Sequence, residues 1–393
     1  PATSGCAAGG NACGGRVARH DGARLKPRRT AVVGAGRSVG NHLGAIDALP
    51  SERIQLVAIV DSDATAAQRA IGAREGVTAY SSMSTMLRAE SPDLVQIVTP
   101  PATHLELCVE ALEAGAWVLC EKPLCMSLAE FESIAAAERA TGGYVSAVSQ
   151  WRYGSAAQLV RRLIDEGVLG RALLGVCNTL WYRPESYYTG SWHGSWATDA
   201  GGPSATLGIH LMDLCLWLMG EWTEVSARMA TLARDIEVED VSLATVSFAS
   251  GALGSFVNSA VSPRQSSYLR LDFEHATAEV DALYRYSNAD WRLSVPDGAT
   301  RLDPLARWRE LDQDRGGRHE AQLERLLDAL DAGVRPPSSG DEALRVLEFL
   351  AALYKSAITG ERVGRGSITR DDPFFHAMNG RPALAPRGTA RLP

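Results

Sequence analysis

Lysine is scarce in this sequence of 393 residues. Of its 39 basic residues only three are lysines, Lys26, Lys122 and Lys355. A lysine that remains in such an arginine-rich chain is a candidate for chemistry that needs an amine. Acidic residues outnumber basic ones by 46 to 39, and the resulting net charge of −7 argues against a general nucleic-acid-binding role.

Cysteines are also few, with seven in the whole sequence. No Cys-x-x-Cys pair occurs and no two histidines have zinc-ligand spacing, so we expect no metal. Most of the cysteines lie in apolar segments, as reduced core cysteines do, which favours a cytoplasmic location. The longest apolar stretch in a predicted helix, 211–219, is interrupted by Asp213. It is shorter than the roughly 20 residues that span a bilayer, so we expect no membrane interaction.

The composition is that of a globular protein, with 46% hydrophobic residues, and the length predicts two domains. Residues 1–29 are rich in Gly, Ala and Arg without a hydrophobic period, which predicts a disordered extension. Strand-like and helix-like segments then alternate over residues 30–150. Strands are expected at 31–33, 54–60, 94–98, 116–120 and 144–148. This order predicts a doubly wound parallel sheet of the Rossmann type.

The pattern changes after residue 150. Helices are expected at 156–166, 203–219, 319–330 and 341–354, with strands of alternating polarity at 241–248, 253–258, 269–273 and 278–284. This predicts a second domain of the α+β class, residues 151–366, with a largely antiparallel sheet, for substrate binding and oligomerisation. Residues 367–393 form a Pro/Gly-rich tail.

A glycine-rich turn, Gly34-Ala35-Gly36-Arg37-Ser38-Val39-Gly40, joins the first strand to the first helix. Such a turn brings a pyrophosphate to the free N–H groups of the helix N-terminus. The usual third glycine is replaced by Val39, and Gly40 follows it. The second strand ends at Asp61, whose carboxylate can bond both ribose hydroxyls and would repel a 2′-phosphate. The pattern therefore favours NAD over NADP, although a purely structural turn and a plain strand-end acid remain alternatives.

Three motifs in order resemble the Gfo/Idh/MocA oxidoreductases from about residue 30 to 360. They are the segment 98–104 (VTPPATH), Glu121-Lys122-Pro123, and the segment 201–213 (GGPSATLGIHLMD). The resemblance implies a Rossmann domain, a second domain with an open sheet, and a dinucleotide in the cleft. It places Lys122 near nicotinamide and substrate, with a cis Lys122–Pro123 peptide in many members. His42 also matches a common family position.

The same resemblance implies a catalytic group of Lys, Asp and His. The lysine is Lys122 and the histidine is His210, but the position of the Asp is occupied by Thr206, and a later acid corresponds to Asp213. Positions 206, 210 and 213 are spaced to share one helix face. An imidazole can take the hydroxyl proton while an ammonium stabilises developing charge. Each residue also has a structural alternative. Lys122 can form a salt bridge, and His210 can be a structural histidine whose nitrogens are hydrogen-bonded. Thr206 can bond within its own helix, and Asp213 can be structural.

Cofactor and substrate residues follow from the turn, the resemblance and an aromatic loop at 181–196. Aromatic faces stack on sugar rings while polar tips bond hydroxyls, although such a cluster can equally pack a domain or subunit interface. The predicted cofactor-binding residues are Gly34, Gly36, Arg37, Ser38, Val39, Asp61, Thr99, Pro100, His104, Glu121 and Lys122. The predicted substrate-binding residues are Lys122, Arg152, Tyr182, Arg183, Tyr188, Trp192, His193, Thr206 and His210.

Together these features predict an NAD-dependent oxidoreductase that acts on a secondary alcohol of a sugar, sugar derivative or cyclitol, in either direction. An NAD-using glycosidase with a transient oxidation and a catalytically idle NAD- or sugar-binding regulator remain alternatives. A short-chain dehydrogenase is excluded because no Tyr-x-x-x-Lys surrounds any of the three lysines. An uncovered sheet face is normally buried, so we expect a homodimer or homotetramer.

Overall fold

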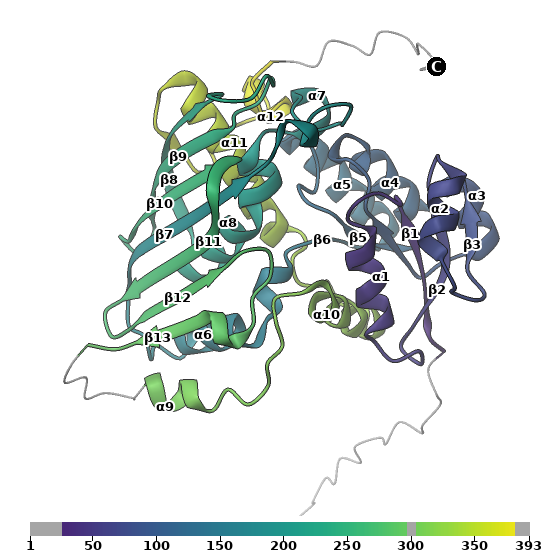
Figure 1. Cartoon of the computed structure of the whole chain (residues 1–393), viewed down its shortest axis with the longest axis horizontal. Coiled ribbons are helices and arrows are strands. Elements are labelled where there is room, and N and C mark those ends of the chain that lie inside the picture. Colours follow the sequence, from purple (N-terminus) through teal and green to yellow (C-terminus); the bar gives the residue numbers. More distant parts are fainter. Residues whose placement is uncertain (1–25, 297–303, 382–393) are drawn as a thin grey trace, which may run out of the picture.

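The structure is a computed structural model that describes residues 26–296 and 304–381. Most of the predicted disordered extension, up to residue 25, and the end of the predicted tail, from residue 382, lie outside these ranges. Two sheets with their helices lie side by side (Figure 1). The first strand begins at Arg28, slightly before the predicted start of the first domain. The domain boundaries themselves remain predictions.

The first sheet has six strands in the order β3-β2-β1-β4-β5-β6, and every pairing is parallel. This confirms the doubly wound sheet predicted from the sequence. The strand order reverses between β1 and β4, and in such folds the ligand binds at the carboxyl ends of those strands. The strands are β1 (Arg28–Val33), β2 (Ile54–Val60), β3 (Thr78–Tyr80), β4 (Leu94–Ile97), β5 (Trp117–Cys120) and β6 (Val145–Ala147).

Helices cover both faces of this sheet, as its continuous apolar strands require. On one face α3 (Met83–Glu90), α4 (His104–Glu113) and α5 (Leu128–Thr141) build one core. On the other face α1 (Val39–Asp47), α2 (Ala64–Ile71) and α10 (His319–Ala332) build a second core. The leucine face of α10 packs on α1, so the chain returns to the first domain after residue 318.

The second sheet has eight strands in the order β13-β12-β11-β7-β10-β9-β8-β14. Only the β7–β10 pair is parallel, which confirms a largely antiparallel sheet. Trp181 and Tyr182 end β7, whereas the sequence analysis placed them in a loop. The strands are β7 (Ala172–Tyr182), β8 (Trp222–Ala230), β9 (Val241–Phe248), β10 (Leu253–Ser259), β11 (Val261–Phe273), β12 (Thr277–Ala282), β13 (Trp291–Ser294) and β14 (Val363–Gly364).

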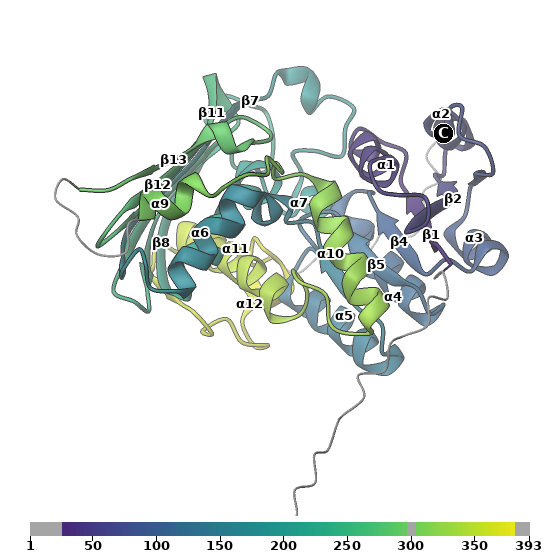
Figure 2. The ribbon, with the colours of Figure 1, turned by 90° about the horizontal axis from the view of Figure 1, so that it is seen from below.

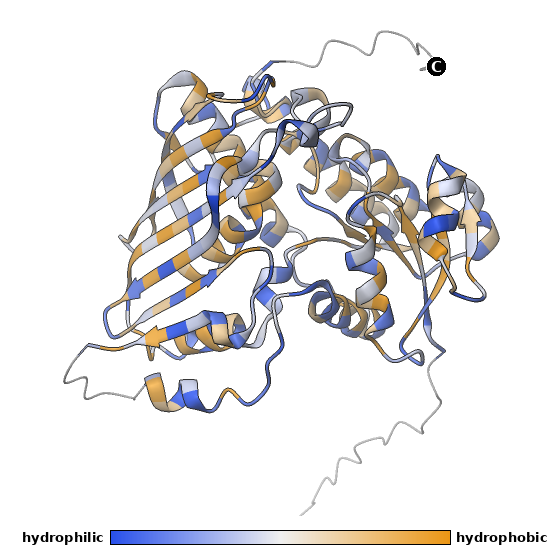
Figure 3. Cartoon of the chain, viewed as in Figure 1, coloured by the Kyte–Doolittle hydropathy of each residue, from blue (hydrophilic) through white to orange (hydrophobic). Residues whose placement is uncertain are grey.

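Within residues 26–296 and 304–381, helices lie on only one face of this sheet, where α6 (Ser155–Asp165), α8 (Ile209–Met219) and α11 (Asp341–Thr359) pack (Figure 2). Apolar and polar residues alternate along its strands (Figure 3), as expected for a sheet with one buried face. The other face exposes Leu174, Leu243 and Leu253 by 40%, 52% and 59%. The described helices include none long and apolar enough to cross a membrane.

Short elements complete the description. The short helices and turns are η1 (Pro101–Thr103), η2 (Gln150–Tyr153), η3 (Glu185–Tyr187), α7 (Trp196–Asp199), the π-helical turn η4 (Ser204–Gly208), η5 (Asn288–Asp290), α9 (Pro304–Arg309) and α12 (Pro373–His376). The turn η4 runs directly into α8, so the predicted helix over 203–219 is present with a widened first turn.

Candidate active site

A cleft opens where β1 and β4 end and where the second domain faces the first. Its volume of about 1670 Å³ exceeds the roughly 300–1,000 Å³ of a site for one drug-sized ligand. The cleft therefore has room for a dinucleotide and a second molecule. The Rossmann domain contributes the glycine turn, Asp61 and the 98–103 segment, and the second domain contributes β7, the aromatic loop and the start of α8.

The glycine turn fits a pyrophosphate. Gly34 has φ +102°, and a Cβ there would lie 2.8 Å from the carbonyl of Val98, so no other residue fits. A Cβ at Gly36 would meet nothing within 4 Å, which leaves open space above the turn. Helix α1 then begins without a side-chain cap from Ser38, which leaves its positive N-terminus directed at an anion, although the N–H groups of Val39 and Asn41 already bond the carbonyls of Gly36 and Ser38. Val39, predicted to bind the cofactor, does not line the cleft.

Asp61 lies beside this turn at the end of β2 and lines the cleft. Its Oδ2 accepts a 2.7 Å bond from the N–H of Ala35, and its Oδ1 accepts a 2.9 Å bond from that of Asp63. These bonds fix the carboxylate next to the glycine turn. Each oxygen keeps a second lone pair, so the geometry permits the predicted contact with ribose hydroxyls.

The 99–104 segment forms the opposite edge of the dinucleotide cleft. Thr99 and Pro100 line it, as predicted. His104 does not line the cleft, because its ring is fully buried. Its nitrogens lie 3.0 Å from the carbonyl oxygen of Pro123 and 2.9 Å from that of Thr99. His104 therefore ties this segment to the Glu121-Lys122-Pro123 turn and would act on the cofactor only through them.

Lys122 reaches across to the second domain. Its peptide bond to Pro123 is cis, and its Nζ donates a 2.6 Å hydrogen bond to the carbonyl oxygen of Thr206. Burial lowers the pKa of the Lys122 ammonium, although the charges of Glu121 and Asp199 work in the opposite direction. The lysine is thus a partly desolvated cation held against the first turn of the helix that carries His210.

Glu121 is the buried counter-ion of this site. Its Oε1 lies 3.3 Å from Nε2 of His42 and 3.5 Å from Nε2 of His319. Burial alone would raise the pKa of Glu121, but both histidines and the Lys122 charge lower it well below its usual value. Over the described ranges, His42, Glu121 and His319 are the one group whose atoms converge closely enough to hold a metal. The absence of a metal remains a prediction.

Thr206 and His210 line the cleft beside Lys122. The hydroxyl of Thr206 donates a 2.9 Å bond to the carbonyl of Gly202, one turn earlier, so it bonds within its own helix. The buried Nδ1 of His210 has no hydrogen-bond partner among the described residues. Burial and the nearby Lys122 charge lower the pKa of His210 well below its usual value. The imidazole is therefore neutral at neutral pH and can accept a proton.

Arg152 and Asp213 form a buried ion pair beside a smaller pocket that Lys122 also lines, and their predicted roles in the site remain predictions. Neither lines the large cleft, and the side chains are only 3% and 5% exposed. Nε of Arg152 donates a 2.6 Å bond to Oδ2 of Asp213, and its Nη1 donates a 3.0 Å bond to Glu342. Asp213 lies one turn beyond His210, where η2 packs on α8. Of the three positions predicted to share one helix face, Thr206 and His210 therefore line the large cleft and Asp213 does not.

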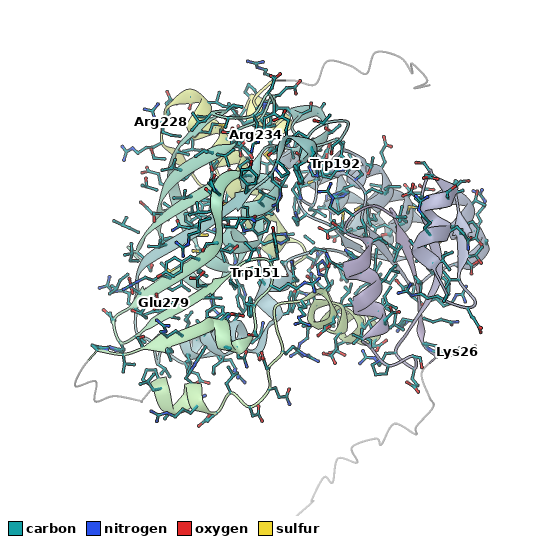
Figure 4. The ribbon with its side chains drawn as sticks, in the orientation of Figure 1. Lys26, Trp151, Trp192, Arg228, Arg234 and Glu279 are labelled. Atoms are coloured by element: carbon teal, nitrogen blue, oxygen red, sulfur yellow. The ribbon has the colours of Figure 1, made fainter. Side chains whose placement is uncertain are left out.

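Four predicted residues of the aromatic segment, Tyr182, Arg183, Trp192 and His193, do line the cleft. Trp192 lies on the side of the second domain that faces the Rossmann domain (Figure 4). Tyr188 is not part of the lining, but Tyr187 is. The ring of Tyr187 stacks on that of His193 with 4.1 Å between the ring centres, and the ring of Trp192 packs against His193 with 3.7 Å between the ring centres.

Two buried acids that sequence reasoning missed hold these groups in place. Oδ2 of Asp199 lies 3.3 Å from Nδ1 of His193 and accepts the N–H of Gly194 at 2.9 Å. Glu239 accepts the N–H groups of Gly202 and Ser204 at 2.9 and 3.1 Å, and so fixes the turn that precedes His210. No local pattern marks Glu239, because its partners are distant in sequence, whereas Asp199 bonds residues five and six positions before it within the same loop.

Comparison with known proteins gives consistent results. The family model described as "Oxidoreductase family, NAD-binding Rossmann fold" matches residues 28–148, and the "GFO/IDH/MocA C-terminal domain" matches residues 157–279. D-apiose dehydrogenase of Paraburkholderia graminis is 28% identical over 368 residues, which are 89% of this chain and 92% of that protein. D-glucoside 3-dehydrogenase of Escherichia coli is 24% identical over 363 residues, 86% of this chain and 97% of that protein.

Among solved structures, the WlbA dehydrogenase of Chromobacterium violaceum in complex with NADH and UDP-GlcNAcA is similar to this chain. Its TM-score is 0.77 at 29% identity, over 86% of this chain and 96% of that one. The two family models together span both domains in the order that the motifs predicted. The chain is a member of the Gfo/Idh/MocA family of oxidoreductases, whose N-terminal domain is an NAD-binding Rossmann fold.

Proposed function

We propose that this protein is an NAD-dependent dehydrogenase that interconverts a secondary alcohol and a ketone on a sugar, sugar derivative or cyclitol. The observation that carries the proposal is the contact of Lys122 Nζ with the carbonyl oxygen of Thr206, 2.6 Å away, in the turn that leads to His210. This contact joins the two domains at the cleft that holds the glycine turn. Relatives named as dehydrogenases of apiose and glucosides support the substrate class.

The residues divide the chemistry between them. The dinucleotide, when bound, supplies the nicotinamide that accepts the hydride. His210 is neutral and takes the hydroxyl proton as the carbonyl forms. The Lys122 ammonium stabilises the negative charge that develops on the same oxygen. Thr206 contributes its carbonyl to Lys122, and its hydroxyl is engaged with Gly202, so we assign it a positioning role.

The pH dependence of kcat/KM for alcohol oxidation should reflect His210 and Lys122. Because the pKa of His210 lies well below 6.5, the rate should stay constant at neutral pH and fall only in more acidic solution. The alkaline fall should begin below pH 10.5, where Lys122 loses its proton. Initial rates from about pH 4.5 to 10 would show both limbs. His210→Gln should remove the acidic limb, and an acidic midpoint at or above 6.5 would contradict the assignment.

Cofactor preference should depend on Asp61. Replacing it by Ser removes a carboxylate that would lie close to a 2′-phosphate, so the ratio of kcat/KM for NADP to that for NAD should rise by about tenfold to a hundredfold. Initial rates with both dinucleotides would measure this ratio. Asp63→Ser is the matched control, because Asp63 caps α2 and does not line the cleft. An equal ratio in Asp61→Ser and the unmodified protein would exclude the predicted contact.

The function is tested by following NADH formation with free sugars, sugar nucleotides, amino sugars and inositols, with NAD and NADP in parallel. Turnover with NAD supports the dehydrogenase and names the substrate class. Tight NAD binding with no net NADH release on any member of the panel would contradict it. That result would favour the glycosidase with transient oxidation or the idle regulator.

We also propose that the open face of the second sheet is a subunit interface. Leu174 and Leu253 are neighbours on β7 and β10, and Leu243 lies on the adjacent strand β9. These exposed leucines lie on one face of three adjacent strands, with Leu243 opposite Val257 and therefore four positions along β10 from Leu253, and an exposed apolar surface of this kind is often covered by a second subunit. Sedimentation analysis of the protein and of a Leu243→Glu, Leu253→Glu variant would test for a homodimer or homotetramer.

A further inference from the structure

The part of the cleft that the second domain lines is rich in cations. Arg183, Arg285 and Arg318 line this wall, together with aromatic rings, and no Asp or Glu of the described second domain lines it. The acids that do line the cleft, Asp61, Glu106 and Glu121, all belong to the Rossmann domain. A wall with three guanidinium groups and no carboxylate favours an anion over a neutral polyol, because a charged acceptor forms the stronger hydrogen bonds with guanidinium.

Arg183 is the most firmly placed of the three. Its guanidinium carbon lies 4.9 Å from the ring centre of Trp181, 5.4 Å from that of Tyr187 and 5.8 Å from that of Tyr284. Its Nη1 donates to the carbonyl of Tyr182 at 3.0 Å and to the hydroxyl of Tyr284 at 3.4 Å. Within the described ranges neither its Nε nor its Nη2 has a hydrogen-bond partner, and no acid pairs with it. The Nε and Nη2 edge of the Arg183 guanidinium is therefore available to a ligand.

The other two arginines extend the same positive wall. Arg285 donates a 2.6 Å bond to the amide oxygen of Asn41 in α1, and Arg318 is exposed at the start of α10. Neither forms an ion pair with a described acid. Arg152 at the domain junction shows the contrast, because Asp213 and Glu342 neutralise it. The cations on the wall thus lack the counter-ions that the fold gives to an arginine kept for structure.

The cofactor does not account for the charge of Arg183. Its pyrophosphate has a separate site at the glycine turn of the Rossmann domain, where Arg37 also lines the cleft. Arg183 lies close enough to Lys122 for its charge to lower the pKa of that lysine, which places it at the reacting end of the cleft. Arg183 therefore faces the space left for the second molecule, whereas Arg285, bonded to Asn41 in the first turn of α1, lies next to the glycine turn.

We infer that the substrate carries an anionic group, a carboxylate or a phosphate, which the free edge of Arg183 binds. Its ring would stack on the aromatic side chains of the same wall. This inference rests on the proposed function and narrows its substrate class. A carboxylate and a phosphate both match the two parallel donors of a guanidinium, so the shared feature is a planar or tetrahedral oxyanion.

The experiment compares matched ligands on the protein saturated with NADH, so that the pyrophosphate site is filled. Three forms of one sugar are used: the neutral glycoside, its uronate and its phosphate. Binding is measured by titration calorimetry, and turnover with NAD is measured in parallel. We expect one anionic form to bind about tenfold to a hundredfold more tightly than the neutral form. Tighter binding of the uronate would identify the oxyanion as a carboxylate, and tighter binding of the sugar phosphate would identify it as a phosphate.

Arg183→Gln should lower this anionic-to-neutral affinity ratio by about tenfold, whereas Arg139→Gln, on the exposed surface of α5, should leave the ratio as it is. Equal or tighter binding of the neutral form would overturn the inference. An anionic-to-neutral affinity ratio that is the same in Arg183→Gln and in the unmodified protein would also overturn the inference. Anion binding that depends on Arg183 without turnover of any form would support the oxyanion site and count against the dehydrogenase.

Discussion

Replacing Lys122 by Met should lower kcat for NAD-dependent alcohol oxidation by about a thousandfold or more. Among the described residues, Lys122 is the one lysine whose ammonium lines the cleft, and it is held against the turn that leads to His210. Removing a preorganised cation from a partly desolvated site costs about 3–4 kcal/mol of transition-state stabilisation, and proton transfer to a misplaced base adds to the loss. Single-turnover rates with saturating NAD and substrate would measure the effect on the chemical step.

Lys355 provides a matched control, because it is the other lysine within the folded domains. Its Nζ forms an ion pair with Asp372, away from the cleft. Lys355→Met should therefore change the stability of the protein but keep kcat within about threefold. Lys122→Arg separates charge from geometry, since arginine keeps the positive charge but presents a larger planar group. A Lys122→Met variant with more than a tenth of the normal kcat would remove Lys122 from the catalytic group.

Much of the fold was predictable because its signals are local. The buried strand 54–60 and the amphipathic α10 show their periods within a few residues, and both elements occur as predicted. The short strand β3 was missed because three half-exposed residues carry no readable period. Strand β7 was not predicted at all, and its last two residues, Trp181 and Tyr182, were placed in a loop because they precede a stretch rich in polar and aromatic residues.

The sequence predicted those parts of the candidate site in which the backbone conformation requires a particular residue type. Gly34 is required by its positive φ and by the close approach of Val98, so the turn could be found from sequence. The sequence could not show which of two adjacent tyrosines faces the cleft, because a loop has no fixed side-chain period, and Tyr187 lines it instead of Tyr188. Glu239 escaped notice because it acts on backbone N–H groups 37 and 35 positions away in sequence.

Arg152→Met should produce the largest loss of stability, about 3–5 kcal/mol. The substitution leaves the carboxylate of Asp213 buried without its counter-ion, between η2 and α8. Glu342, on the other side of Arg152, is 45% exposed, so water can replace its partner. Urea-induced unfolding followed by tryptophan fluorescence would measure the change, because Trp151 lies directly beside Arg152 and is buried.

The double variant Arg152→Met, Asp213→Leu decides between a structural pair and a catalytic acid. If the pair is structural, replacing both charges by apolar groups of similar size should recover most of the lost stability, because no unpaired charge then remains in the interior. A double variant that is as unstable as Arg152→Met would contradict this account. Asp213→Asn tests the predicted catalytic role directly: a hundredfold loss of kcat at an unchanged free energy of unfolding would support that role for Asp213. We expect the opposite result: Asp213→Asn should lower the free energy of unfolding and leave kcat of the folded protein nearly unchanged. The reason is that the Asp213 side chain bonds Arg152 and does not line the large cleft.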